Sequence, residues 1–156
     1  MSVHRATVDW ALGEGDFAKG RYSRLHTIGF DGGISVPGSA SPAVVPSPWS
    51  SGEAVDPEAA FTAALSACHM LTFLDLARRA GFTVSAYRDE AEGTLAHVAR
   101  GKMAVTRVVL RPVIAWTGAK RPSAAEIDTL HHEAHELCFI SNSVTTEVVV
   151  ESPSTE

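Results

Sequence analysis

Residues 56–81 have the sequence DPEAAFTAALSACHMLTFLDLARRAG, and this stretch decides the fold. Asp56 can cap the first turn of a helix, and Pro57 suits that turn because its missing N–H would have no partner there. Gly81 follows two arginines and can end the helix. Between these signals the residues are apolar on almost every side. The pattern therefore predicts a helix over residues 57–80 that is buried on most faces.

Segments on both sides of this helix have the alternating or β-branched composition of strands. The cluster Asp31-Gly32-Gly33 favours a hairpin turn, and Pro112 restricts its strand to an edge or a bulge. From Pro37 to Asp56 the chain is rich in Pro, Ser and Gly and is expected to form a loop. The expected strands cover residues 3–12, 21–30, 34–37, 82–98, 103–116 and 143–150.

A second helix is expected after Pro122. Ser123 and Glu126 fit a capping box, with Ser123 as the N-cap. The residues that follow place one apolar stripe on the helix. This stripe consists of Ile127, Leu130, Ala134, Leu137 and Cys138. The order of strands, helix, strands, helix and strand, without a repeat or a linker, indicates one α+β domain over residues 1–156.

The composition argues against nucleic acid and membrane as partners. The 13 basic and 18 acidic residues leave a formal net charge of −5, and no Lys/Arg block is present that could follow a phosphate backbone. No apolar run approaches the roughly 18 residues that span a bilayer. Residues 1–10 lack the apolar core of a signal peptide. We therefore expect a cytoplasmic protein, in a compartment where thiols are kept reduced.

The chain has two cysteines, Cys68 and Cys138, which lie 70 positions apart. In a reducing compartment such a pair indicates catalysis or simple packing rather than a structural disulfide. Cys68 falls in the middle of the first helix among apolar neighbours, and burial alone raises the pKa of a thiol and makes it inert. A reactive Cys68 therefore needs a cation from elsewhere in the fold. Arg21 and Arg24, on an early strand, are the candidates.

Cys138 lies at the end of the second helix, on its apolar stripe. Core packing is one interpretation, because a free cysteine behaves as a small hydrophobe. The other is that two helices that pack their apolar stripes together bring Cys138 close to Cys68. A disulfide needs Cα atoms within roughly 7 Å, and a peroxidatic thiol works best with a resolving partner.

Three histidines, His131, His132 and His135, precede Cys138. His131 and His135 share a helix face, so a metal site that includes Cys138 is geometrically possible. A polar rim along the helix is the simpler interpretation of all three. His69 is the neighbour of the first cysteine but points about 100° away from it around the helix, so the two do not form a catalytic pair.

The stretch around the first cysteine resembles the signature helix of the OsmC/Ohr family, which starts Asn-Pro-Glu and reaches Ser-Ala-Cys after small and apolar residues. Residues 56–70 carry this resemblance, and residues 137–143 resemble the family's second cysteine region. A further resemblance, to the first hairpin of a branch whose first cysteine is followed by His, is carried by Tyr22-Ser23-Arg24 together with His26. His26 itself is expected on the surface of its strand. The resemblance covers residues 5–150.

The resemblance implies an α+β fold in which antiparallel sheets surround the two long central helices of an intertwined homodimer. It also implies a thiol-dependent peroxidase that reduces organic hydroperoxides or hydrogen peroxide without metal or flavin, with an external dithiol as the reductant. By position, Cys68 is the peroxidatic thiol and Cys138 the resolving thiol. Glu58 is the carboxylate that pairs with an arginine near the reactive thiol. Arg24 fits the Tyr-Ser-Arg pattern, and Arg21 fits an arginine at the hairpin tip.

Two positions depart from the family pattern, and one alternative keeps the fold without the enzyme. Asp56 stands where Asn is common, and it still serves as an N-cap. Phe139 follows the second cysteine where better-known branches often have Pro, which bears on substrate preference and on resolution. The alternative is a dimeric module that binds a small apolar or acyl ligand, with Cys68 only lining the pocket.

Overall fold

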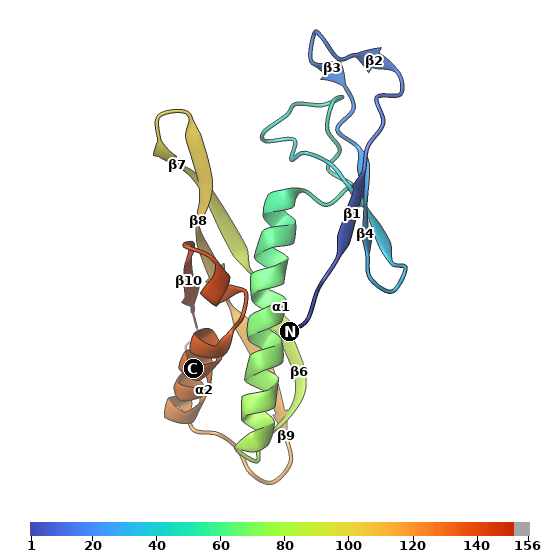
Figure 1. Cartoon of the computed structure of the whole chain (residues 1–156). Coiled ribbons are helices and arrows are strands. Elements are labelled where there is room, and N and C mark those ends of the chain that lie inside the picture. The colour runs from blue at the N-terminus through green and yellow to red at the C-terminus, as the bar shows by residue number, and fades with distance from the viewer. Residues whose placement is uncertain (152–156) are drawn as a thin grey trace. The chain divides into compact units, whose positions relative to one another are not determined.

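The computed structural model describes residues 1–151, which fall into two compact units, Met1–Ala60 and a second that starts at Phe61. Helix α1 (Pro57–Arg79) begins in the first unit and continues through the second (Figure 1). The first unit holds β1 (Ala6–Asp9), β2 (Gly15–Asp16), β3 (Arg21–Tyr22), β4 (His26–Phe30) and β5 (Ser35–Gly38). The second holds β6 (Thr83–Asp89), β7 (Glu92–Ala99), β8 (Lys102–Leu110), β9 (Pro112–Thr117), α2 (Ala124–Leu137), the 3-10 helix η1 (Ser141–Ser143) and β10 (Glu147–Val150). The predicted α+β class is confirmed.

The first unit is built on an antiparallel sheet of three strands in the order β1-β4-β5. The predicted hairpin turn joins β4 to β5, and its Gly32 and Gly33 have φ values of 93° and 82°, which favour glycine. The single strand expected over residues 21–30 is wrong, because the segment divides into β3 and β4. Ser23 lies at the break, where its hydroxyl accepts the N–H of Leu25 and so replaces a bond to a neighbouring strand.

The second unit has a β6-β9 pair and a three-stranded sheet in the order β10-β8-β7. Its strands pair antiparallel except β10, which runs parallel to β8. The two strands expected over residues 82–98 and 103–116 are four strands in the structure. The second break has a clear cause, because the N–H of Arg111 donates to the Asp89 side chain at 2.6 Å and Pro112 has no N–H to donate. The last strand starts at Glu147, later than expected, because η1 precedes it.

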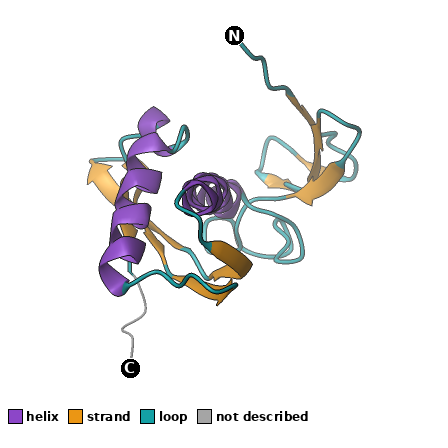
Figure 2. Cartoon of the chain, turned by 90° about the horizontal axis from the view of Figure 1, so that it is seen from below, coloured by secondary structure: helices purple, strands orange, loops and turns teal. Residues whose placement is uncertain are grey.

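Two clusters of buried side chains hold α1 to the elements of the second unit. Leu65 packs with Val108 of β8, and Phe73 packs with Phe82 and with Leu130 of α2. Burial of each such side chain stabilises the fold by about 1.5–3 kcal/mol. Figure 2 looks along α1 and shows α2 crossing beside it, with the strands of the second unit next to both. The middle of α1 is thus fixed in rotation against the unit that carries α2.

The helices begin and end at the signals that the sequence predicts. An Asp56 carboxylate oxygen accepts the N–H of Ala59 at 2.8 Å at the start of α1. Gly81, with a φ of 78°, follows the end of that helix. Ser123 forms the capping box at the start of α2, and Cys138 is its C-cap. The end of α2 therefore determines where the second cysteine lies.

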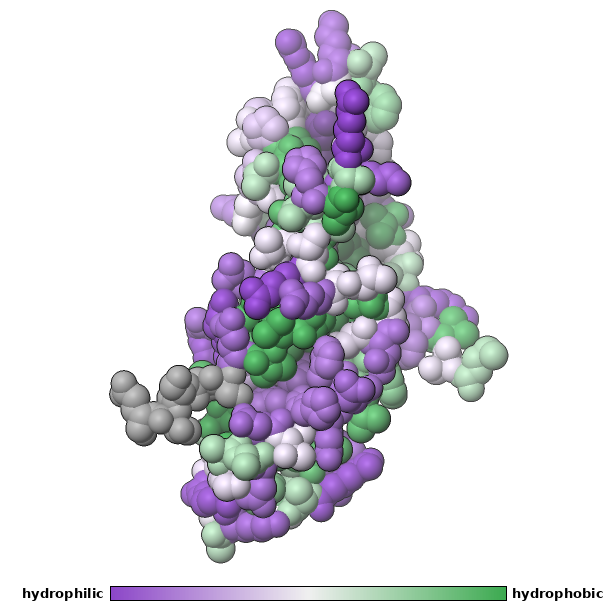
Figure 3. Space-filling model, turned by 90° about the vertical axis from the view of Figure 1, so that its left-hand side faces the viewer, coloured by the Kyte–Doolittle hydropathy of each residue, from purple (hydrophilic) through white to green (hydrophobic). Residues whose placement is uncertain are grey.

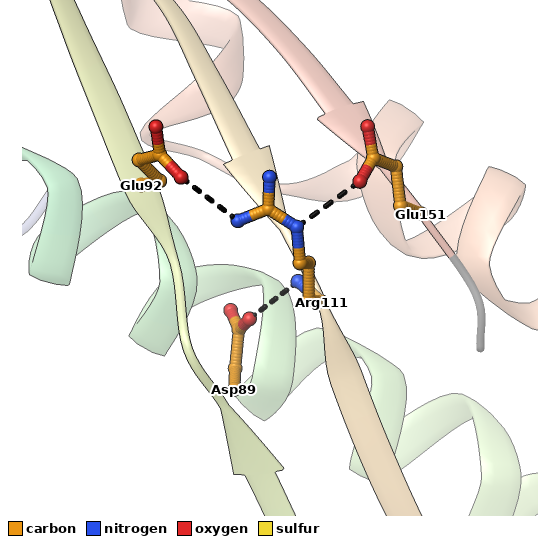
Figure 4. A network of polar contacts seen from close by, with 4 residues as sticks. All are labelled: Asp89, Glu92, Arg111 and Glu151. Atoms are coloured by element: carbon orange, nitrogen blue, oxygen red, sulfur yellow. Dashed lines mark hydrogen bonds and ion pairs between the residues drawn. The ribbon is translucent and has the colours of Figure 1, made fainter.

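A polar network ties the strands of the second unit to α1 (Figure 4). The Arg111 guanidinium pairs with Glu92 at 3.2 Å and with Glu151 at 3.1 Å. The Asp89 carboxylate accepts the Arg111 backbone N–H. Its other oxygen accepts the hydroxyl of Ser66 on α1. The arginine ion pairs are exposed and screened by water, so they add little stability. The bond from Ser66 matters more, because it fixes the turn of α1 that carries the first cysteine.

One side of α1 is uncovered in the single chain. Its exposed apolar residues are Ala63, Ala64, Ala67 and Leu71, which lie at helical spacing on one face. By length and composition α1 could cross a membrane, with a hydropathy of 1.4 over a window that is 22% buried. The expectation that no segment reaches this threshold is therefore wrong, since it counted only uninterrupted apolar runs. Core helices of globular proteins pass the same test. An apolar face of this kind needs to be covered by another surface.

Candidate functional site

The structure brings Cys68 and Cys138 together. Cys68 is half-buried in the middle of α1, and Cys138 is fully buried at the end of α2; both are free thiols. Their side chains lie close enough for each thiol to affect the ionisation of the other. The prediction that packing of the two helices brings the cysteines close is confirmed. A pair of thiols in direct contact can pass a proton between them, and it is poised to form a disulfide.

The turn that follows α2 wraps backbone N–H groups around the two sulfurs. The N–H of Ser141 donates to Cys138 Sγ at 3.5 Å. Backbone groups of Phe139 and Ile140 form hydrogen bonds to the Cys68 sulfur, and Ile140 also contributes at Cys138. The turn is fixed by a bond from the Asn142 N–H to the Cys138 carbonyl at 3.0 Å. Hydrogen bonds of this kind favour a charged sulfur over a neutral one.

The two thiols have opposite tendencies to ionise. Burial raises the pKa of Cys68, and the hydrogen bond that it donates to Cys138 raises it further. Burial by itself also raises the pKa of Cys138, but hydrogen bonds from Cys68 and Ser141 outweigh it and leave that pKa below the usual value. Burial thus opposes ionisation of both thiols, and the backbone hydrogen bonds at the two sulfurs act against it.

His69 and His131 form a buried pair that joins α1 to α2. His69 Nε2 lies 3.0 Å from His131 Nδ1, and the two rings stack. Burial lowers the pKa of His69 to about 4, and the neighbouring His131 and His135 lower it in the same direction. Burial likewise lowers the pKa of His131 to about 4. Both imidazoles are neutral at physiological pH, and the prediction that His131 belongs to a polar rim is wrong, since it is 5% exposed.

A groove lies between α2 and β10, with a cavity volume of about 390 Å³. It is lined by Asp128, His131, His132, His135 and Val148, Val149 and Val150. Figure 3 shows the face that carries α2, where apolar side chains gather over the middle and polar ones border them. Among residues 1–151, no three His, Cys, Asp or Glu side chains are arranged to hold a metal ion. The alternative of a metal site built from His131, His135 and Cys138 is therefore not supported.

Arg24 lines a second pocket, which lies within the first unit and has a volume of about 340 Å³. Its lining residues are Trp10, Phe17, Tyr22, Arg24, His26, Ser39, Ala40 and Pro57. The Arg24 guanidinium lies 3.8 Å above the Tyr22 ring, and one of its nitrogens donates to the carbonyls of Gly20 and Tyr22. His26 is half-buried, not on the surface as expected, and its Nδ1 donates to the Arg24 carbonyl at 2.8 Å. The arginine is thus held at the wall of a largely aromatic pocket.

Of the four residues predicted for the site, the structure places Cys68 and Cys138 in contact. Arg24 and Glu58 belong to the first unit, with Glu58 half-buried in the first turn of α1, and their role at the thiols stays a prediction. The sequence pattern did not point to Ser141, whose backbone N–H donates to the Cys138 sulfur from three residues further along the chain.

Comparisons with known proteins agree on the fold. The profile of a family described as OsmC-like protein matches residues 50–152. An OsmC-like protein of unknown function from Vibrio cholerae is 49% identical, with a TM-score of 0.94 over 98% of this chain and 100% of that one. An organic hydroperoxide resistance protein from Legionella pneumophila is 20% identical (TM-score 0.69, 97% and 96% covered), and OhrB of Bacillus subtilis is 16% identical (TM-score 0.65, 97% and 98% covered). Among curated proteins, none matches the chain significantly.

Proposed function

This chain belongs to the OsmC-like protein family, and on that basis we propose that it is a cysteine-based peroxidase that reduces organic hydroperoxides or hydrogen peroxide. The observation that carries the proposal is the pair of free thiols, Cys68 and Cys138, which lie near each other. Two of the more distant structural relatives are described as organic hydroperoxide resistance proteins, which is in keeping with this chemistry. We also propose that the chain belongs to the branch with Ser-Ala-Cys-His at the first cysteine, which its own sequence at Cys68 supports.

The proposed reaction needs only the two thiols, a peroxide and an external dithiol. The Cys68 sulfur attacks the distal peroxide oxygen, so that an S–O bond forms, the O–O bond breaks, and an alcohol or water leaves. The Cys138 sulfur then attacks the sulfenic sulfur, an S–S bond forms, and water leaves. A dithiol reduces this disulfide by exchange and restores both thiols.

Counting thiols after exposure to peroxide tests this proposal. The wild-type protein, treated with cumene hydroperoxide or hydrogen peroxide, is expected to lose both free thiols and two mass units, because a disulfide forms. Cys138→Ser is expected to stop one step earlier, with an oxidised Cys68 that is detectable by intact mass. If both thiols remain unoxidised in an excess of both peroxides, the peroxidase proposal is wrong and the binding module is the remaining candidate.

We propose that Arg24 lowers the pKa of the Cys68 thiol during turnover and that Glu58 holds its guanidinium. A cation is needed because burial raises the pKa of Cys68 in the reduced chain. Arg24→Met is expected to lower the peroxidase rate constant by about 10²- to 10³-fold, the usual cost of removing one group that stabilises charge in the transition state. It should also shift the pH profile of Cys68 alkylation upward.

Arg21→Met is the matched control, since Arg21 lies on the same hairpin but does not line the aromatic pocket. An unchanged pH profile of Cys68 alkylation in Arg24→Met, with a changed one in Arg21→Met, would transfer the role to Arg21.

We further propose that the whole chain, residues 1–156, acts as one cytoplasmic domain in an intertwined homodimer. The uncovered apolar face of α1, with Ala63, Ala67 and Leu71 exposed, supports a second copy as its cover. An apolar face of this kind is typical of an interface between subunits.

The second candidate is a module that binds a small apolar ligand, and the pocket beside Arg24 favours it. Trp10, Phe17 and Tyr22 gather their rings there, with the Phe17 and Tyr22 centroids 4.7 Å apart. Such aromatic walls bind apolar ligands whether or not a reaction follows. The thiol count separates the two candidates, because a binding module has no reason to oxidise Cys68.

A further inference from the structure

Contacts within the first unit hold Arg24 at its backbone and at its guanidinium. Its backbone N–H donates to the Trp49 carbonyl at 3.0 Å. Its guanidinium carbon lies 3.8 Å above the Tyr22 ring, and Nη1 donates to the Gly20 and Tyr22 carbonyls. Among residues 1–151, no hydrogen bond or ion pair involves Nε or Nη2 of this arginine. The edge that these two nitrogens form is therefore left for a ligand or a carboxylate.

The carbonyl of Arg24 lies between two strands, because β3 ends at Tyr22 and β4 begins at His26. The side chain of His26 supplies the donor that a neighbouring strand would otherwise give, with Nδ1 at 2.8 Å from this carbonyl oxygen. A carbonyl only accepts, so Nδ1 carries the proton in this bond. Both backbone groups of the arginine are thus fixed, the N–H by Trp49 and the carbonyl by His26.

The His26 ring has room because Gly38 has no side chain. The two residues are partners in the antiparallel pair β4-β5. A β-carbon at Gly38 would overlap Nε2 of the ring and would lie only 2.7 Å from its Cδ2. The φ of Gly38 is outside the left-handed region that favours glycine. The imidazole, and not the backbone conformation, therefore requires a glycine at this position.

We propose that His26, packed on Gly38, is a positioning residue that holds Arg24 in the orientation in which it acts on the peroxide and on the Cys68 thiol. This role rests on the proposed peroxidase function of Arg24 and deepens it. The guanidinium bonds to carbonyls of its own loop, so its place depends on the backbone that His26 fixes. A preformed arginine avoids the loss of rotamer entropy that a free side chain meets with each substrate molecule.

The test separates the proton donor of His26 from its ring. His26→Phe keeps a ring and loses the donor. It is expected to lower the peroxidase rate constant by about 10- to 100-fold, the size of effect when a functional group is misplaced, and to shift the pH profile of Cys68 alkylation upward. His26→Asn puts an amide N–H near the position of Nδ1, and it is expected to keep at least about half of the wild-type rate.

Gly38→Ala tests the contact from the other side. Its β-carbon displaces the imidazole, so this variant is expected to resemble His26→Phe. The same substitution is expected to have a smaller effect when His26→Asn is already present, because two of the three crowded atoms, Nε2 and Cε1, are then gone. Gly29→Ala is the matched control on β4. Its β-carbon would meet Thr7 at 3.9 Å, an ordinary contact, and the rate should not change.

An NMR measurement without peroxide keeps this test separate from the peroxidase reaction. The Arg24 Nε–H signal is assigned with Arg24→Met. In the wild type and in His26→Asn, the Tyr22 ring current is expected to shift this signal, since the guanidinium lies above the ring. In His26→Phe and Gly38→Ala, the signal is expected to move toward that of an unrestrained arginine.

The proposal fails if the Arg24 signal in His26→Phe equals that of the wild type. It also fails if Gly38→Ala and Gly29→Ala lower the rate equally, or if Arg24→Met lowers the rate and His26→Phe does not. A different result concerns only the arginine. If the Arg24 signal moves in His26→Phe while Arg24→Met leaves the Cys68 alkylation profile unchanged, His26 holds the arginine and the proposed role of Arg24 at the thiol is wrong.

Discussion

Cys68→Ser is expected to lower kcat/KM for cumene hydroperoxide by at least about 10³-fold, with dithiothreitol as the reductant. A serine hydroxyl is far less acidic than a thiol and cannot attack a peroxide oxygen at neutral pH. The variant should fold normally, because Cys68 is half-buried and Ser66, half a turn earlier, keeps its bond to Asp89. The measurement is the rate of hydroperoxide loss at equal protein concentration.

Cys138→Ser is the informative comparison for this variant. It keeps the attacking thiol, so it is expected to consume about one equivalent of hydroperoxide per chain in a first turnover and then slow down. A Cys68→Ser protein that retained more than about a tenth of the wild-type rate would show that Cys68 is not the nucleophile. If both variants lost the first turnover to the same extent, the first step would need both thiols, and Cys68 could not be named as the only nucleophile.

Acidification from pH 7.5 to 5 is expected to lower the free energy of unfolding by about 2–4 kcal/mol through the His69–His131 pair. Each folded-state pKa is about 4, while a histidine in the unfolded chain titrates near 6.5. Below pH 6.5 the unfolded chain therefore binds protons that the folded chain does not. The stability is fully present above pH 6.5 and is lost as the pH falls toward 4. Urea unfolding at several pH values measures this slope.

The double variant His69→Asn with His131→Asn should reduce the slope between pH 7.5 and 5, at some cost in stability at pH 7.5. His132→Asn is the matched control, because His132 is exposed on the same helix, and it should keep the wild-type slope. The groups that face the pair are His135 and Asp89. A slope that survives in the double variant would place the acid sensitivity elsewhere.

The sequence was sufficient to predict the elements that depend on local chemistry. The caps at Asp56 and Ser123, the glycine stop at Gly81 and the hairpin at residues 31–33 depend on nearest neighbours, and each is where the pattern predicts it. The contact between the cysteines was also predictable, because apolar stripes on two helices tend to meet.

Contacts between distant segments could not be predicted from the sequence. The strand break at Arg111 depends on Asp89, 22 residues earlier, which takes its N–H. His131 appears polar in a helix pattern, yet it is buried because His69, 62 positions away, supplies its partner. Both cases concern a polar group whose partner, and therefore whose free energy of burial, is set by the tertiary fold.

The uncovered apolar face of α1 links the stability of the chain to whatever covers that face. Apolar surface left in water costs about 25 cal/mol per Å², so anything that covers Ala63, Ala67 and Leu71 stabilises the folded chain by mass action. With a second copy as the cover, as proposed above, dilution weakens the fold that holds the thiols, although no contact within one chain changes. The cellular concentration of the protein then helps to keep Cys68 and Cys138 in place.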